Sequence, residues 1–249
     1  MSPDNGEPSA AGTDSPDSSP LDLLEHGGHQ QTSARRLFVQ LHAFGGASDT
    51  KPLTAALERS RLEAVLYADV NDPSGVAVLV LAEDPTAFTG AVREVLGGAP
   101  FTGLTHKPQL TMLGRTYSSG YEADLEDWLL RRPRRAVLNA EATWAIWYPL
   151  RRTPSFARLT PREQSTILRE HAALGRMYGD ADLAHDVRLA CHGLDRDDND
   201  FVIGLTGHDL YPLTHLVQAM RKTAQTSEYI QSLGPFFVGH VVWRAPLPA

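Results

Sequence analysis

The sequence predicts an α+β protein built from two ferredoxin-like β-α-β-β-α-β halves. Two observations carry this prediction: the same order of expected strands and helices occurs twice, and one pattern recurs in both halves. That pattern is a polar turn, an apolar strand and an acid-opened helix, found at 71–88 and again at 195–213. Each half would place its helices on one face of its sheet, and the simplest cover for the other face is the other half.

The first half is expected over residues 35–140. Its elements are a strand over 37–44, a helix over 52–62, strands over 62–70 and 76–84, a helix over 85–97 and a strand over 109–117. Apolar runs bounded by turn residues predict the strands, and helical spacing after Asp49 and Pro52 predicts the first helix. Residues 121–135 are expected to form a connecting helix, because their basic C-terminal end suits the helix dipole.

The second half is expected over residues 141–249 and repeats this order. Its elements are a strand over 143–150, a helix over 161–179, strands over 187–194 and 200–207, a helix over 210–223 and a strand over 235–243. Thr160 and Glu163 around Pro161 form a capping box, which fixes the start of the long helix. The acidic turn 195–200 lacks the glycine and terminal glutamate of an EF-hand, so we interpret it as a hairpin turn.

Composition narrows the class of protein. The 249 residues carry 23 Lys+Arg against 30 Asp+Glu, a net charge of −7, which argues against nucleic-acid binding. The single Cys191 excludes an internal disulfide and a cysteine-rich metal site, and no apolar run predicts a membrane helix. We therefore expect a cytoplasmic protein without membrane or nucleic-acid partners. Residues 1–34, rich in Ser, Pro, Asp and Gly, are expected to be a disordered tail.

His171 is the main candidate for chemistry. It shares a face of the helix over 161–179 with Leu168, Leu174 and Gly175, so the imidazole is aimed at an apolar interior. One interpretation is a core histidine with a hydrogen bond. The other is an axial ligand to a flat apolar cofactor, because haem iron accepts a neutral imidazole from one side.

Tyr148 ends an aromatic strand and is followed by Arg151 and Arg152, while Arg134 and Arg135 end the connecting helix. In one interpretation, the tyrosine packs in the core and the arginines are solvated at the surface. The other is an anionic ligand, since guanidinium groups suit carboxylates and the tyrosine could anchor or oxidise such a ligand. His185 and His192 are expected to face opposite sides of a strand and so not to share a metal ion.

From Trp144 onward the sequence resembles the chlorite dismutase family, which includes the coprohaem decarboxylases. The residues that carry the resemblance are WYPLRR, LTPREQSTILREHAALGRMYG, HGLDRDDNDFVIGL, LVQAMRKTAQTSEY and GPFFVG. The resemblance implies a dimeric α+β barrel, assembled as a homo-oligomer and usually as a pentamer. It also implies an iron porphyrin cofactor, haem b or coprohaem.

The resemblance also implies roles for individual residues. His171 would be the proximal iron ligand, and Tyr148 matches the tyrosine that acts as a radical relay to a propionate. Arg152 stands where decarboxylases often have a lysine, Thr226 where a serine binds a propionate, and Arg134 or Arg135 would match a propionate-binding arginine.

Asp186 is aligned with the distal arginine of chlorite dismutases, and Arg188 follows two residues later on the same side of the strand. An acidic distal group could accept a proton from peroxide, but would not hold a chlorite anion as arginine does.

The resemblance therefore implies a haem-dependent oxidoreductase that decarboxylates coprohaem to haem b, with hydrogen peroxide or another small oxidant. The alternatives are a chlorite-degrading or peroxidase-like haem enzyme, which Arg188 would favour, and a non-catalytic haem-binding protein.

Overall fold

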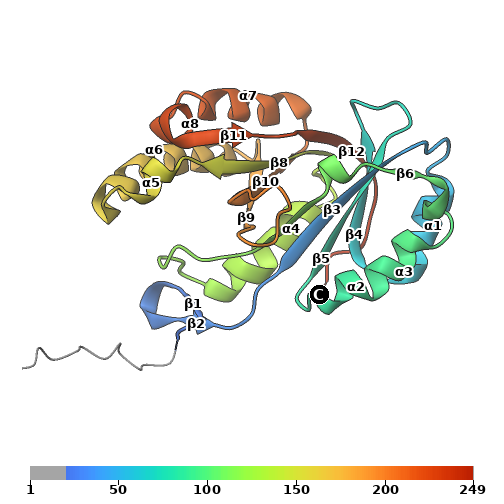
Figure 1. Ribbon diagram of the computed structural model, residues 1–249, viewed down its shortest axis with the longest axis horizontal. Helices are drawn as coiled ribbons and strands as arrows, with labels where there is room; N and C mark the ends of the chain where they lie inside the picture. Colours follow the sequence, from blue (N-terminus) through green and yellow to red (C-terminus); the bar gives the residue numbers. More distant parts are fainter. Residues whose placement is uncertain (1–20, 249) are drawn as a thin grey trace, which may run out of the picture.

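The computed structural model describes residues 21–248 and confirms a mixed α+β fold with an antiparallel sheet (Figure 1). The first half contains β3 (Phe38–Gly45), α1 (Lys51–Ser60), β4 (Glu63–Asp69), β5 (Val76–Ala82), α2 (Thr86–Thr89), α3 (Ala91–Gly97), η2 (Phe101–Gly103), β6 (Thr105–His106), η3 (Pro108–Leu110) and β7 (Met112–Arg115). The helical segment η4 (Asp127–Arg131) and α4 (Arg132–Leu138) connect the halves. Among the described residues, no helix is long and apolar enough to cross a membrane.

The second half contains β8 (Trp144–Arg152), α5 (Pro154–Ala157), α6 (Pro161–Asp180), β9 (His185–Ala190), β10 (Phe201–Gly207), α7 (Leu210–Met220), α8 (Ala224–Tyr229), β11 (Ile230–Leu233) and β12 (Phe237–Arg244). The capping box of α6 is confirmed: Thr160 N donates to Glu163 Oε2 at 2.8 Å, and Glu163 N donates to Thr160 Oγ1 at 3.4 Å.

The main strands follow one hydrogen-bonded path. In the first half the order is β7-β3-β5-β4, and in the second it is β12-β8-β10-β9. If the four main strands of each half are numbered along the chain, their order in the sheet is fourth, first, third, second in both halves. The halves are joined where β4 pairs with β12 and β7 pairs with β9, so the path closes into a ring of eight strands.

Three apolar clusters form the core. One includes Leu41, Leu79, Trp147 and Val187 and joins strands of both halves to the connecting helix. A second packs the first half's sheet against α1, α2 and α3. The third packs β8 and β10 against α6 and α7 (Figure 1). The candidate site lies on this third face.

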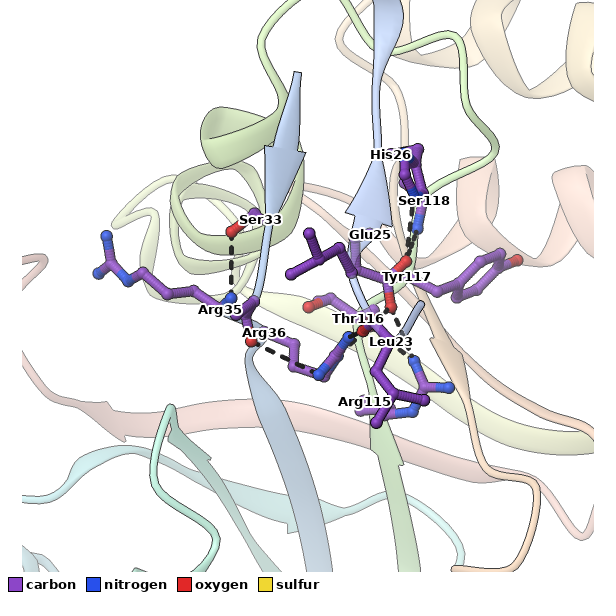
Figure 2. Close-up of polar contacts among 12 residues, drawn as sticks. Leu23, Glu25, His26, Ser33, Arg35, Arg36, Arg115, Thr116, Tyr117 and Ser118 are labelled. Carbon is purple, nitrogen blue, oxygen red and sulfur yellow. Dashed lines mark hydrogen bonds and ion pairs between the residues drawn. The ribbon is translucent and has the colours of Figure 1, made fainter. Parts of the chain in front are cut away.

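The N-terminal tail expected over 1–34 is wrong in its extent. Within it, β1 (Glu25–His26) and β2 (Thr32–Ser33) pair around the helical turn η1 (Gly28–Gln30). Figure 2 shows the partly buried Glu25 carboxylate among Arg36, Arg115 and Ser118. Arg115 Nη1 donates to Glu25 Oε1 at 3.1 Å, and Ser118 N donates to Glu25 Oε2 at 2.9 Å. These contacts replace the apolar burial that the segment lacks, and residues 1–20 lie outside the described residues.

Several expected boundaries also differ. The helix over 85–97 divides at Gly90, which is non-helical. The connecting helix includes a π-helical turn, and the strand expected over 187–194 is instead His185–Ala190. The short strand β11 was not expected; it pairs with the end of β8 and extends that strand through Arg152.

Candidate functional site

His171 lies in the middle of α6, half-buried on the side that faces β8 and β9. Burial, together with the charges of Arg188 and Arg152, lowers the pKa of His171 to about 4. The imidazole is therefore neutral at physiological pH, which is the form that can ligate a metal.

Thr223, just before α8, lies within hydrogen-bond distance of one ring nitrogen of His171. Its hydroxyl donates to the Met220 carbonyl at 2.8 Å and lies 3.4 Å from His171 Nδ1. A hydroxyl has one hydrogen, so the threonine oxygen accepts from Nδ1–H. Nε2 then keeps its lone pair, the arrangement typical of histidines that bind a metal through Nε2.

Tyr148 stands on β8, on the face that packs against α6 and α7. The register places it beside Ile203 of β10, and Ile203 beside Arg188 of β9, so the three residues form one row. The Tyr148 ring stacks on Phe236 with 4.6 Å between centroids. Burial raises the pKa of the Tyr148 phenol, and the charge of Asp186 adds to this effect. The phenol therefore stays protonated and has a hydrogen to give.

Asp186 and Arg188 project to the same side of β9, as expected from their spacing. Arg188 Nε lies 2.7 Å from Asp186 Oδ2, and Arg132 Nη2 lies 2.5 Å from Asp186 Oδ1. Both guanidinium groups cover the ring of Trp128, at 4.6 Å for Arg132 and 5.0 Å for Arg188. Burial disfavours the carboxylate, but the charges of Arg188 and Arg132 outweigh it and hold the pKa of Asp186 below its usual value.

Arg152, at the end of β8, is a cation without an ionic partner among the described residues. Its guanidinium lies over Phe156 at 4.5 Å and Phe201 at 4.7 Å, and its buried Nε has no hydrogen-bond partner. Burial lowers the pKa of Arg152. An unpaired cation between aromatic rings is well suited to an anionic group of a ligand.

Tyr117, which sequence reasoning missed, comes from the first half. It follows β7, and its ring lies 5.5 Å from Phe201. Burial raises its pKa, opposed by the charges of Arg188 and Arg152, so Tyr117 belongs to the same cluster. The pairing of β7 with β9 brings it there, a contact that no local pattern reveals.

Arg134 and Arg135 are not brought to this cluster. Arg134 Nε lies 2.6 Å from Glu63 Oε2, and Arg135 Nη1 lies 2.6 Å from Asp127 Oδ1. The connecting helix instead contributes Arg132, which sequence reasoning missed.

Thr226 lines a cavity of about 260 Å³ with Arg221 and residues of β11. The positive charge of Arg221 opposes the rise in the pKa of Tyr148. The cavity therefore lies close to the face of the sheet that carries Tyr148.

The fold and site thus define an α+β protein with a neutral imidazole on a helix, a buried phenol opposite, and an unpaired guanidinium at the edge. The family model for chlorite dismutase matches residues 47–242. The chain belongs to the chlorite dismutase family.

Solved structures agree in fold. A novel haem-binding protein from Thermus thermophilus is 18% identical with a TM-score of 0.65, covering 83% of this chain and 91% of that one. A chlorite dismutase from Candidatus Nitrospira defluvii in complex with imidazole is 16% identical with a TM-score of 0.63, covering 86% and 93%. The comparison with curated proteins finds no match.

Proposed function

We propose that this protein is a haem-binding oxidoreductase that decarboxylates coprohaem to haem b with hydrogen peroxide. The observation that carries the proposal is the hydrogen bond between His171 and Thr223, which leaves Nε2 of a neutral imidazole free on the face that holds Tyr148 and Arg152. Members of the family and the similar haem-binding protein support an iron porphyrin as the ligand.

The residues present fit such a cofactor. His171 would ligate the iron, and Arg152, whose buried Nε lacks a partner, would bind a propionate carboxylate. Arg221 and Thr226 line one cavity and together offer a cation and a hydroxyl to a second carboxylate. In α6, no residue is fully buried, so its apolar side retains surface that a flat apolar ligand would cover.

Bound haem iron supplies the redox chemistry that couples peroxide reduction to oxidation of a propionate. Conversion of one propionate consumes one hydrogen peroxide and one proton. It yields one vinyl group, one carbon dioxide and two waters. The propionate loses two electrons and one proton, its Cα–carboxylate bond breaks, and peroxide takes up the electrons.

Tyr148 would act as the relay. Its phenol is protonated because burial raises its pKa, so it can give up a hydrogen atom and then take one from a propionate carbon. The stacked ring of Phe236 fixes the orientation of Tyr148 and limits water access to it.

Asp186 would accept and return the proton of peroxide. Its carboxylate is ionised because Arg132 and Arg188 hold its pKa low. The same ion pairs keep both guanidinium groups oriented around Trp128.

The arrangement of each half supports the proposal that the two are ferredoxin-like units of a dimeric α+β barrel, with the strand order last, first, third, second. By the same resemblance we propose a cytoplasmic homo-oligomer, a pentamer, with a role in haem biosynthesis.

The experiment is to incubate the full-length protein with coprohaem, add hydrogen peroxide stepwise and determine the mass of the porphyrin. Wild type is expected to lose two carboxyl groups, and Tyr148→Phe to lose none while still binding coprohaem. Tyr211→Phe removes an exposed phenol of α7 and serves as the matched control, with activity within twofold of wild type. Unchanged conversion by Tyr148→Phe would refute the relay.

Arg188 favours a second candidate, a chlorite-degrading or peroxidase-like enzyme, because it stands in the same row as Tyr148. Oxygen release from chlorite by the haem-loaded protein, lost in Arg188→Gln, would support that function. Tight porphyrin binding with neither reaction would leave a non-catalytic haem-binding protein.

A further inference from the structure

A pair of histidines lies on the other half of the protein, on β3 and β6. His42 Nδ1 is 3.2 Å from His106 Nε2, and the Thr111 hydroxyl oxygen is 3.1 Å from the same His106 Nε2. A hydrogen bond joins the two imidazole nitrogens, so one of them carries the hydrogen, and a metal ion bound by both would take the place of that hydrogen.

The backbone fixes this convergence. β6 pairs with the end of β3, placing His106 opposite Phe44, and Lys107 N donates to the Ala43 carbonyl at 2.8 Å. The chain then turns back through η3, where Thr111 N donates to the Pro108 carbonyl at 3.2 Å. Phe44 packs under the pair, with its ring centroid 5.3 Å from that of His106.

We propose that His42 and His106 form a binding site for a late first-row divalent metal ion such as Zn²⁺ or Cu²⁺. Two nitrogens bound to zinc at 2.0–2.1 Å in tetrahedral geometry are about 3.3 Å apart, close to the separation found here. Imidazole nitrogens suit these ions, and not magnesium or calcium, which prefer oxygen.

The surroundings also permit a cation. Burial lowers the pKa of both histidines and so favours the neutral imidazole, the form of the ring that can ligate a metal. The nearby ammonium group of Lys107 is offset by two carboxylates, Asp72 at 2.7 Å and Asp69 at 3.3 Å. His106 is exposed, so waters can fill the remaining coordination positions.

The site has only two histidine ligands. The described residues contain no group of three or more His, Cys, Asp and Glu side chains that could hold a metal ion. Two protein ligands and open positions predict a labile site, accessible to a further ligand, and not a closed structural site.

The test is a zinc titration of the tag-free, full-length protein, in competition with a chromophoric chelator. The background variant His171→Ala keeps the proposed axial ligand from competing. In this background one zinc ion is expected to bind, and adding His42→Gln or His106→Gln should weaken binding at least tenfold. Adding His185→Gln removes a half-exposed histidine whose Nε2 lies 2.6 Å from Asp182 Oδ1, and should change the zinc affinity less than twofold.

Either histidine variant binding zinc within twofold of the background, or no zinc binding at micromolar concentrations, would overturn the proposal. Far-UV circular dichroism checks that each variant folds. If one does not, imidazole ¹⁵N spectra of the background protein give the second test. Zinc should shift His42 Nδ1 and His106 Nε2 together, and the absence of both shifts contradicts the site.

Discussion

Nδ1 of His171 lies 3.4 Å from the hydroxyl oxygen of Thr223, joining α6 to the residue that precedes α8. Since the threonine hydrogen is given to Met220, the contact leaves Nδ1 as the donor and Nε2 as the free nitrogen. A neutral hydroxyl is a weaker acceptor than a carboxylate, so it orients the imidazole without giving it strong anionic character.

Replacing Thr223 tests this orientation. Thr223→Val removes the acceptor at nearly constant volume, and we expect coprohaem affinity to fall by about tenfold, at the lower end for an outer-shell partner. The iron–histidine stretching frequency of the reduced complex should also decrease. Thr223→Ser keeps the hydroxyl and should have the coprohaem affinity and stretching frequency of wild type. If Thr223→Val and Thr223→Ser give the same two values, Thr223 does not orient His171.

Replacing Asp186 tests the ion-pair cluster. Asp186→Asn leaves Arg132 and Arg188 without their carboxylate, and the free energy of unfolding should fall by about 1–3 kcal/mol, measured by urea denaturation. The expected loss of stability is moderate because the Asp186 side chain is 29% exposed and water screens its charge. Asp182→Asn, at a side chain that is 88% exposed, should change it by less than about 0.5 kcal/mol. Equal losses in both variants would contradict the account.

The pH dependence of stability should report His42. Its pKa falls from an ordinary value of 6.5 to about 4 on folding, so between these values the unfolded chain binds more protons. Stability is therefore lost as pH falls from 6.5 to 4.

His42→Gln should reduce this dependence by up to about 1.4 kcal/mol per pH unit, measured by denaturation with a metal chelator present. The pKa of His171 is lowered in the same direction, so His171 adds to the pH dependence of stability. This contribution is the same in wild type and in His42→Gln. His208→Gln, at an exposed histidine, should keep the wild-type slope; an unchanged slope in His42→Gln would disprove the assignment.

Local patterns were sufficient for much of the fold. The capping box of Thr160 and Glu163 predicted the start of α6, and its helical spacing placed His171 on the inner side. Strand alternation likewise put Asp186 and Arg188 on one side of β9.

Contacts distant in sequence could not be found this way. Thr223 reaches His171 across 52 positions, and Tyr117 enters the site only through the joint between β7 and β9. The contact between Arg132 of the connecting helix and Asp186 was not predicted either. The π-helical turn η4 adds one residue to a helical turn, so the side chains that follow it point in other directions than in a regular α-helix. Arg132, the first residue after η4, therefore reaches Asp186.

The proposed function depends most on His171, which would ligate the iron of a bound porphyrin. Resonance Raman spectra of the reduced coprohaem complex test it most directly. Wild type should show an iron–histidine stretching band, and His171→Ala should lose it and regain a five-coordinate spectrum when imidazole is added. His215→Ala, on α7, should keep the band. An iron–histidine band that persists in His171→Ala, with unchanged coprohaem affinity, would contradict the claim.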